Sequence, residues 1–280
     1  MRGRFLSVYG GRGGVRVQSV VFVEGVSGAG KTSCLLELQR RLLQRGLAVK
    51  AYTEGDPASP LDLCWVAYVT QEEARRLTRS IRGAKEEMEQ NLLLSEGDAL
   101  LVRYRNREGP SCSMQLYEAL RALELNYKPK RLVAPETFKR VFEELWKRFD
   151  QGEEREELLL FDGSLLSHTA NDMLRNYGAS AEEIAGQVLR LAGALEGKRI
   201  LVLYLDPEEM KKRLQEARRS RGQSPAGPGE LAFWMARRKV DLAVLQQLAV
   251  HKVILAVDGR DWDGVLDRML RALERFVLLR

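Results

Sequence analysis

The chain has 280 residues, and its 45 lysines and arginines outnumber its 39 aspartates and glutamates, which gives a formal net charge of +6. With 45% hydrophobic and 30% charged residues, the composition is that of a globular protein and excludes a disordered or fibrous chain. No apolar run approaches the roughly 18 residues of a membrane span. The basic first segment lacks the apolar block of a signal peptide, so we expect a soluble, cytoplasmic protein.

The cysteines and histidines are too few and too scattered to indicate a metal centre or a disulfide framework. They are Cys34, Cys64, Cys112, His168 and His251. Residues 1–17 are basic and broken by glycines, and we expect them to form a flexible arm in front of a single domain over residues 18–280.

Five short apolar runs predict buried strands, with helical patterns between and after them. The runs are 20–23, 47–52, 158–161, 199–205 and 253–257. Leucines at helical spacing predict a helix over 32–45, and an amphipathic pattern over 265–277 predicts a terminal helix. Apolar strands that alternate with helices indicate an α/β fold with a doubly wound, five-stranded parallel sheet. Ligands of such sheets bind beyond the carboxyl ends of the strands.

A long charged segment over about residues 70–157 predicts a mostly helical insertion in this domain. Within it, residues 99–105 are consistent with either a short strand or a loop. The insertion carries a small group of basic and aromatic residues that either line an acceptor pocket or lie on the surface. They are Arg103, Tyr104, Arg105 and Arg107.

The first strand leads into a complete phosphate-loop motif, G-x-x-x-x-G-K-[ST]. Its residues are Gly25, Val26, Ser27, Gly28, Ala29, Gly30, Lys31 and Thr32, and Ser33 follows. The glycines let the backbone turn its N–H groups toward a phosphate, and the following helix presents further free donors at its N-terminus. We expect Lys31 to reach the β- and γ-phosphates and the Thr32 hydroxyl to bind Mg²⁺.

Acidic residues follow all five of the predicted strands. Asp162 comes after the third strand and is the candidate for a second Mg²⁺ contact, although an Asp-Gly turn is the alternative. Glu54 and Asp56 follow the second strand, and either one could orient the acceptor hydroxyl or take its proton; Asp56 could instead cap the turn before Pro57. Asp206, before a proline, is expected to begin a helix.

A block of basic residues precedes the Pro/Gly-rich loop over 222–229. It consists of Lys211, Lys212, Arg213, Arg218, Arg219 and Arg221. A solvated helix face is one interpretation. The other is a lid over about 211–230, in which Arg218, Arg219 or Arg221 stabilises the transferring phosphoryl group, while Arg213 contacts the nucleotide.

Taken together, these motifs resemble the nucleoside and nucleotide kinases among the P-loop proteins, and thymidylate kinases in particular. The resemblance rests on V-F-V-E-G-V-S-G-A-G-K-T, Y-T-E-G-D, F-D-G, L-V-L-Y-L-D-P, R-R-S-R and the turn at 257–259 that precedes the last helix. It implies a P-loop fold and transfer of the ATP γ-phosphoryl group to a small acceptor. The family has an Asp-Arg pair where this chain has Asp162-Gly163, so the acceptor need not be thymidylate.

The sequence therefore predicts a kinase that uses ATP and Mg²⁺ and acts on a nucleoside, a nucleotide or another alcohol. The alternative is an NTP-hydrolysing switch whose insertion docks a partner protein. Nucleic-acid binding ranks last, because no aromatic residues are interleaved with the basic block. No membrane partner is expected, and a homodimer is possible.

Overall fold

The computed structural model of the chain describes residues 18–127, 129–152, 158–257 and 261–278. The prediction of a flexible arm over residues 1–17 lies outside this part. The five predicted strands form one parallel sheet in the order β10-β9-β1-β8-β2. Their bounds are Ser19–Glu24 (β1), Val49–Tyr52 (β2), Leu158–Asp162 (β8), Arg199–Pro207 (β9) and His251–Val257 (β10). The predicted α/β fold is confirmed.

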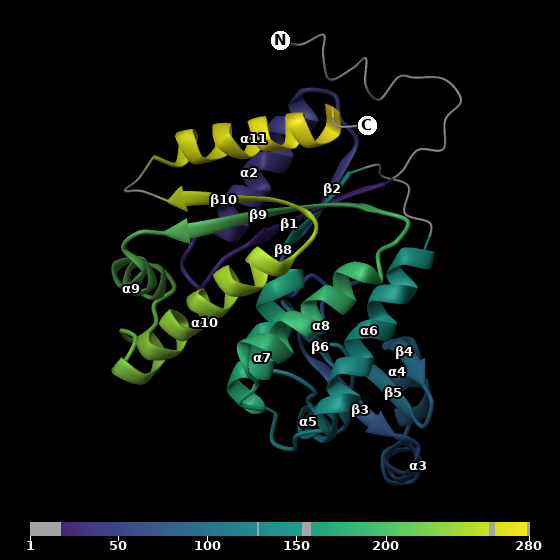
Figure 1. Cartoon of the computed structure of the whole chain (residues 1–280). Helices are drawn as coiled ribbons and strands as arrows, with labels where there is room; N and C mark the ends of the chain where they lie inside the picture. The colour runs from purple at the N-terminus through teal and green to yellow at the C-terminus, as the bar shows by residue number, and fades with distance from the viewer. Residues whose placement is uncertain (1–17, 128, 153–157, 258–260, 279–280) are drawn as a thin grey trace, which may run out of the picture.

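Helices cover both faces of this sheet, as Figure 1 shows. Two helices lie together on one face, α2 (Lys31–Gln44) and α11 (Trp262–Leu278). Four pack on the other face, α6 (Pro135–Gln151), α7 (Thr169–Asn176), α8 (Ala181–Gly193) and α10 (Pro228–Gln247). Because every residue of β1 is buried, this strand is apolar on both sides, as a central parallel strand requires.

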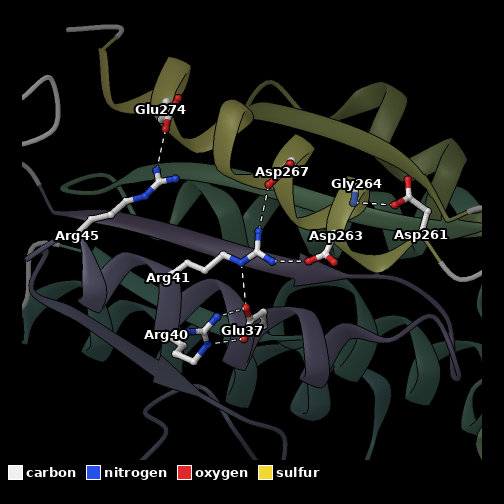
Figure 2. Close-up of polar contacts among 9 residues, drawn as sticks. All are labelled: Glu37, Arg40, Arg41, Arg45, Asp261, Asp263, Gly264, Asp267 and Glu274. Carbon is white, nitrogen blue, oxygen red and sulfur yellow. Dashed lines mark hydrogen bonds and ion pairs between the residues drawn. The ribbon is translucent and has the colours of Figure 1, made fainter. Parts of the chain in front are cut away.

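Charged side chains join α2 to α11 along their outer edge (Figure 2). The Arg41 guanidinium donates to Asp263 at 2.6 Å and to Asp267 at 3.1 Å, and Arg45 pairs with Glu274 at 2.9 Å. A single exposed ion pair contributes about 0–1 kcal/mol. Three such pairs join the two helices above their shared apolar core, and Trp262, the first residue of α11, lies against the phosphate loop.

The insertion carries a sheet of its own, which the sequence did not predict. Three antiparallel strands, β3 (Val66–Thr70), β5 (Ala99–Arg103) and β4 (Leu92–Glu96), pair in that order, and the short strands β6 (Arg105–Asn106) and β7 (Gly109–Pro110) follow. The helices are α3 (Gln71–Ser80), α4 (Ala84–Gln90) and α5 (Met114–Arg121). Residues 99–105 are thus mostly strand, and these elements share a separate small core.

Two further elements shape the sheet's carboxyl edge. One turn of π-helix, η1 (Ser164–His168), follows β8, and α9 (Met210–Ser220) follows β9. The prediction that Asp206 begins a helix is wrong, because β9 continues to Pro207 and the Asp206 carboxylate instead accepts two hydrogen bonds from Arg238, at 2.5 and 2.7 Å. Within the described ranges, none of the helices combines the length and the hydrophobicity that a bilayer crossing demands.

Candidate functional site

The phosphate loop turns between the end of β1 and the start of α2, at the centre of the sheet. Its exposed surface is formed by the glycines and by Ser27, Lys31, Thr32 and Ser33, which all face one cavity. Val26 and Ala29 are completely buried and hold the loop to the core. The Lys31 ammonium lies back over the loop and donates to the Val26 carbonyl at 3.4 Å.

The N-terminus of α2 is open to an anion. The residue before it, Gly30, has no side chain to cap the first turn, so the N–H groups there are left for another acceptor. Gly30 also has φ +91°, and an added Cβ would lie 2.5 Å from the Trp262 ring. Only glycine satisfies both conditions.

Thr32 and Asp162, the two predicted Mg²⁺ contacts, are brought together. The Thr32 hydroxyl donates to Asp162 Oδ2 at 2.5 Å. Asp162 is 2% exposed, and its Oδ1 has no hydrogen-bond partner in the described part of the chain. A buried carboxylate oxygen without a donor fits a hard cation such as Mg²⁺, which prefers oxygen ligands, so this pair is suited to the metal that the sequence implies.

Glu24, at the end of β1, fixes the turn that follows β8. Its buried carboxylate accepts from the N–H groups of Leu165 and Leu166 at 2.7 and 2.9 Å, and from the Ser167 hydroxyl at 3.0 Å. Burial raises the pKa of Glu24, although these donors and nearby cations oppose the shift. The contacts lock η1 in place and thereby orient His168 beside the loop.

A cavity of about 950 Å³ extends from the phosphate loop across the carboxyl edge of the sheet. Beyond the loop, its wall comes from the β2–β3 connection, the segment after α5, the start of α7, and the α9–α10 hairpin. These residues are Glu54, Cys64, Trp65, Glu124, Asn126, Tyr127, Ser167, His168, Asn171, Asp172, Arg175, Arg218, Arg221, Gln223, Glu230, Phe233 and Trp234. The cavity therefore has a phosphate end and a second, separate compartment.

The structure separates the two carboxylates that the sequence could not rank. Glu54 lines the cavity, and its carbonyl accepts from Arg107 of the β6–β7 hairpin. Asp56 is not among the lining residues, and its carboxylate caps the local turn by accepting from the Ala58 N–H at 2.9 Å. Of the two, Glu54 is in position to meet an acceptor.

The basic block also divides. Arg218 and Arg221 line the cavity, whereas Arg219 does not. Arg218 is held by Glu230, at 2.7 and 2.9 Å, and by the Ser224 carbonyl. Arg213 lies beside the phosphate loop. Its carbonyl oxygen is so close to Gly28 that a Cβ added to this glycine would lie 3.0 Å from it.

Arg213 and Trp262 make a cation–π contact at the edge of the phosphate loop. The guanidinium lies 4.9 Å from the centre of the indole ring. Residues 258–259 of the turn on which the sequence resemblance partly rests lie outside the described residues. Trp262 was not predicted as a site residue, and nothing in its local sequence distinguishes it from the other residues of an amphipathic helix.

Two aromatic residues of the cavity hold an unusual backbone conformation. Trp65 and Tyr127 have φ of 56° and 68°, and they are the non-glycine residues with positive φ in the described ranges. Arg105 lies 5.4 Å over the Trp65 ring, and Arg175 lies 5.5 Å over the Tyr127 ring. Such backbone strain costs about 1–3 kcal/mol and concentrates at functional sites. The two strained residues therefore mark this part of the cavity as a candidate binding site.

The end of η1 and the first turns of α7 supply polar groups that sequence reasoning missed. His168, Asn171, Asp172 and Arg175 all line the cavity. Their spacing of three and four residues directly after the Asp162 strand end was a usable signal, because it puts them on one helix face. Burial raises the pKa of Asp172 to about 6, while the Tyr127 N–H donates to its carboxylate at 2.6 Å.

The basic group of the insertion serves the cavity in different ways. Arg103 is buried and donates to the carbonyls of Asp62 and Cys64, at 2.7 and 3.0 Å. The Tyr104 hydroxyl donates to Glu124 at 2.7 Å. These two residues brace the wall from behind, whereas Arg105 and Arg107 lie over it.

No protein-family model matches the chain, and no curated protein matches it in sequence. Among solved structures, it is similar to thymidylate kinase from Ehrlichia chaffeensis, with 10% sequence identity and a TM-score of 0.44, over 91% of this chain and 98% of that chain. The α/β fold itself is shown by the strand order, and a likeness of this size assigns neither a substrate nor an activity.

Proposed function

We propose that the protein is a P-loop phosphotransferase that uses ATP and Mg²⁺ to phosphorylate a small-molecule acceptor. The observation that carries the proposal is the single cavity, which joins the phosphate loop to a second compartment lined by polar and aromatic residues. An enzyme that only hydrolyses a nucleotide needs no such compartment, whereas a transferase must hold an acceptor beside the phosphates.

At the phosphate end, the loop N–H groups and Lys31 bind the phosphates, and Thr32 and Asp162 hold the cation. Mg²⁺ bound there supplies neutralisation of phosphate charge. Arg218 and Arg221 approach from the α9–α10 hairpin, where a guanidinium stabilises charge on the transferring group. Glu54 orients the acceptor hydroxyl or takes its proton.

The acceptor compartment favours a planar molecule that carries hydrogen-bond donors. Trp65, Tyr127 and Phe233 offer ring faces. The Oδ1 atoms of Asn126 and Asn171 are buried without a hydrogen-bond partner among the described residues, and such atoms cost about 1–3 kcal/mol each until a donor arrives. Nucleosides and nucleotides meet these requirements, and other alcohols with an N–H or O–H donor form the wider class.

The test is ADP formation from MgATP with a panel of nucleosides, nucleotides, sugars and antibiotic alcohols. We expect at least one acceptor to stimulate ADP formation, and the stimulated rate to fall about 100-fold in Lys31→Ala. With that acceptor, Asn171→Ala should raise its KM and leave the KM for ATP unchanged. If no acceptor raises the rate above that of Lys31→Ala, the proposal fails.

The same assay examines the alternative of an NTP-hydrolysing switch. Hydrolysis without any acceptor, stimulated by a partner protein, would favour that function. The insertion supplies Asn126 and Tyr127 to the cavity wall, and this favours a role in acceptor binding over one as a docking platform.

A further inference from the structure

A second cluster of side chains of the types that bind metals lies in the cavity wall, formed by residues other than Thr32 and Asp162. It consists of Asp62, Cys64 and His168, whose ligand atoms all lie within 4.8 Å of one another. Spacing along the sequence could not reveal it, because Asp62 and Cys64 precede β3 and His168 ends η1. The fold brings the two segments together.

The cluster has an unsatisfied member. His168 is 8% exposed, and its Nε2 has no hydrogen-bond partner in the part of the chain that the structure describes. A buried ring nitrogen in this state costs about 1–3 kcal/mol. A metal ion at the cluster would give this nitrogen a partner.

The other two ligands are held in place by the surrounding backbone. The Asp62 carboxylate accepts from the N–H groups of Gly55 and Cys64, at 2.5 and 2.6 Å, and each oxygen keeps a lone pair. Arg103 binds the carbonyls of Asp62 and Cys64 from the buried side. The Asp62 carboxylate and the backbone of Cys64 are therefore held near one another before any ion arrives.

The donor set selects the class of ion. A thiolate, an imidazole and a carboxylate together suit zinc, whereas Mg²⁺ and Ca²⁺ prefer oxygen alone. Metal bonds of about 2.0–2.3 Å put neighbouring ligands of a tetrahedral ion about 3.5 Å apart, so closure of the cluster requires a contraction on the order of 1 Å.

We propose that Asp62, Cys64 and His168 form a three-ligand zinc-class site whose fourth coordination position faces the acceptor compartment. Cys64 and His168 line the cavity, so this position is accessible to a small molecule with an oxygen or nitrogen donor. On binding, a bond forms between the ion and the Cys64 sulfur while the S–H proton passes to solvent, and His168 binds through a neutral ring nitrogen. The proposal does not rest on kinase activity.

The test uses the full chain, freed of metal with a chelator and titrated with Co²⁺. We expect one ion per chain, a thiolate-to-cobalt absorption band in the near ultraviolet, and loss of that band when Zn²⁺ is added. Cys64→Ser should abolish the band, and His168→Gln should weaken affinity about 10- to 100-fold. Cys112→Ser, a half-buried cysteine outside the cluster, is the matched control and should leave the spectrum unchanged.

Absence of a thiolate band in the native chain would overturn the site, and so would an unchanged band in Cys64→Ser. Because Cys64→Ser exchanges a single atom, it keeps the test decisive if His168→Gln fails to fold. Lys31→Ala separates the two proposals, since it should remove nucleotide binding and retain the cobalt spectrum. A chain that binds MgATP but gives no band would retain the phosphotransferase proposal and lose the zinc site.

Discussion

The indole ring of Trp262 packs directly on the backbone of Gly30, the last residue of the phosphate loop before α2. Trp262 begins α11, and the ion pairs of Arg41 with Asp263 and Asp267 tie that helix to α2. The shape of the loop therefore depends on a residue more than 200 positions later in the chain.

This contact predicts a sharp difference between two glycines of similar backbone conformation. Gly30→Ala should weaken ATP binding more than about tenfold, because the methyl group meets the Trp262 ring at a φ that alanine disfavours. Gly46 has φ +80° with open space around it, so Gly46→Ala should cost about 1–2 kcal/mol of stability and leave ATP binding intact. Calorimetric titration of both variants measures this, and equal ATP affinities would contradict the interpretation.

The unpaired Asp162 oxygen predicts how nucleotide binding responds to metal removal. In the native chain, chelation of Mg²⁺ should lower ATP affinity substantially. Asp162→Asn retains an acceptor for the Thr32 hydroxyl but loses the negative charge, so it should reduce affinity in the presence of Mg²⁺ by about 10- to 100-fold and respond little to chelator. Fluorescent-nucleotide titration with and without EDTA gives the comparison. A full chelator effect in Asp162→Asn would exclude this carboxylate from the metal site.

Neighbouring arginines of α9 should differ in their importance. Arg218 lines the cavity and is held by Glu230, whereas Arg219 lies outside the cavity wall. With an identified acceptor, Arg218→Ala should lower kcat about 100-fold and Arg219→Ala less than about twofold. Glu230→Gln, which removes the charge partner of Arg218, should fall between them. Similar losses for both arginines would show that α9 acts through its overall charge.

The raised pKa of Asp172 predicts a pH-dependent stability. Its pKa in the folded chain is about 6, against 3.8 in an unperturbed aspartate, mainly because it is buried. His168 and Arg175 oppose this shift, and Tyr177 lies close enough to feel the charge. Since the folded state holds the proton more tightly than the unfolded state, the contribution of Asp172 to stability is full below about pH 4 and is lost as the pH rises through about 6.

Asp172→Asn keeps an acceptor for the Tyr127 N–H and cannot ionise. The native chain should therefore lose about 3 kcal/mol relative to this variant between pH 3.5 and pH 7, as measured by urea unfolding at both values. Asp98→Asn, at an exposed position, is the control and should follow the native chain. A difference between native and Asp172→Asn that is constant with pH would refute the assignment.

The sheet could be predicted from sequence because its central strands, β1, β8 and β9, are buried on both faces and show as continuous apolar runs. The insertion was harder, since its strands are separated by charged helices and end in polar or charged residues such as Thr70, Glu96 and Arg103. β5 pairs with both β3 and β4, and such antiparallel contacts depend on partners that composition does not reveal. The mixed pattern of residues 99–105 therefore supported a strand and a loop equally well.

The candidate site also has one part that could be predicted from the sequence and one that could not. The phosphate loop, Thr32 and Asp162 follow rules tied to strand ends, and the structure places these residues together. The acceptor compartment is assembled from four separate segments, so no local sequence pattern could predict it. Trp65 and Tyr127 are exceptional only in their backbone dihedral angles, which tertiary contacts impose. Asp56 has the right residue type near the right strand end, but its carboxylate caps a turn.

The strand order also dictates when the nucleotide site can form during protein synthesis. β1 comes first in the chain yet lies at the centre of the sheet, where Ser19 pairs with Leu158 on one side and Arg199 on the other. A nascent chain therefore cannot complete the strand that carries the phosphate loop until β9 has left the ribosome. Until then the apolar β1 segment lacks at least one of its two partner strands, so its protection by a chaperone or by early collapse of α2 would govern the yield of folded protein.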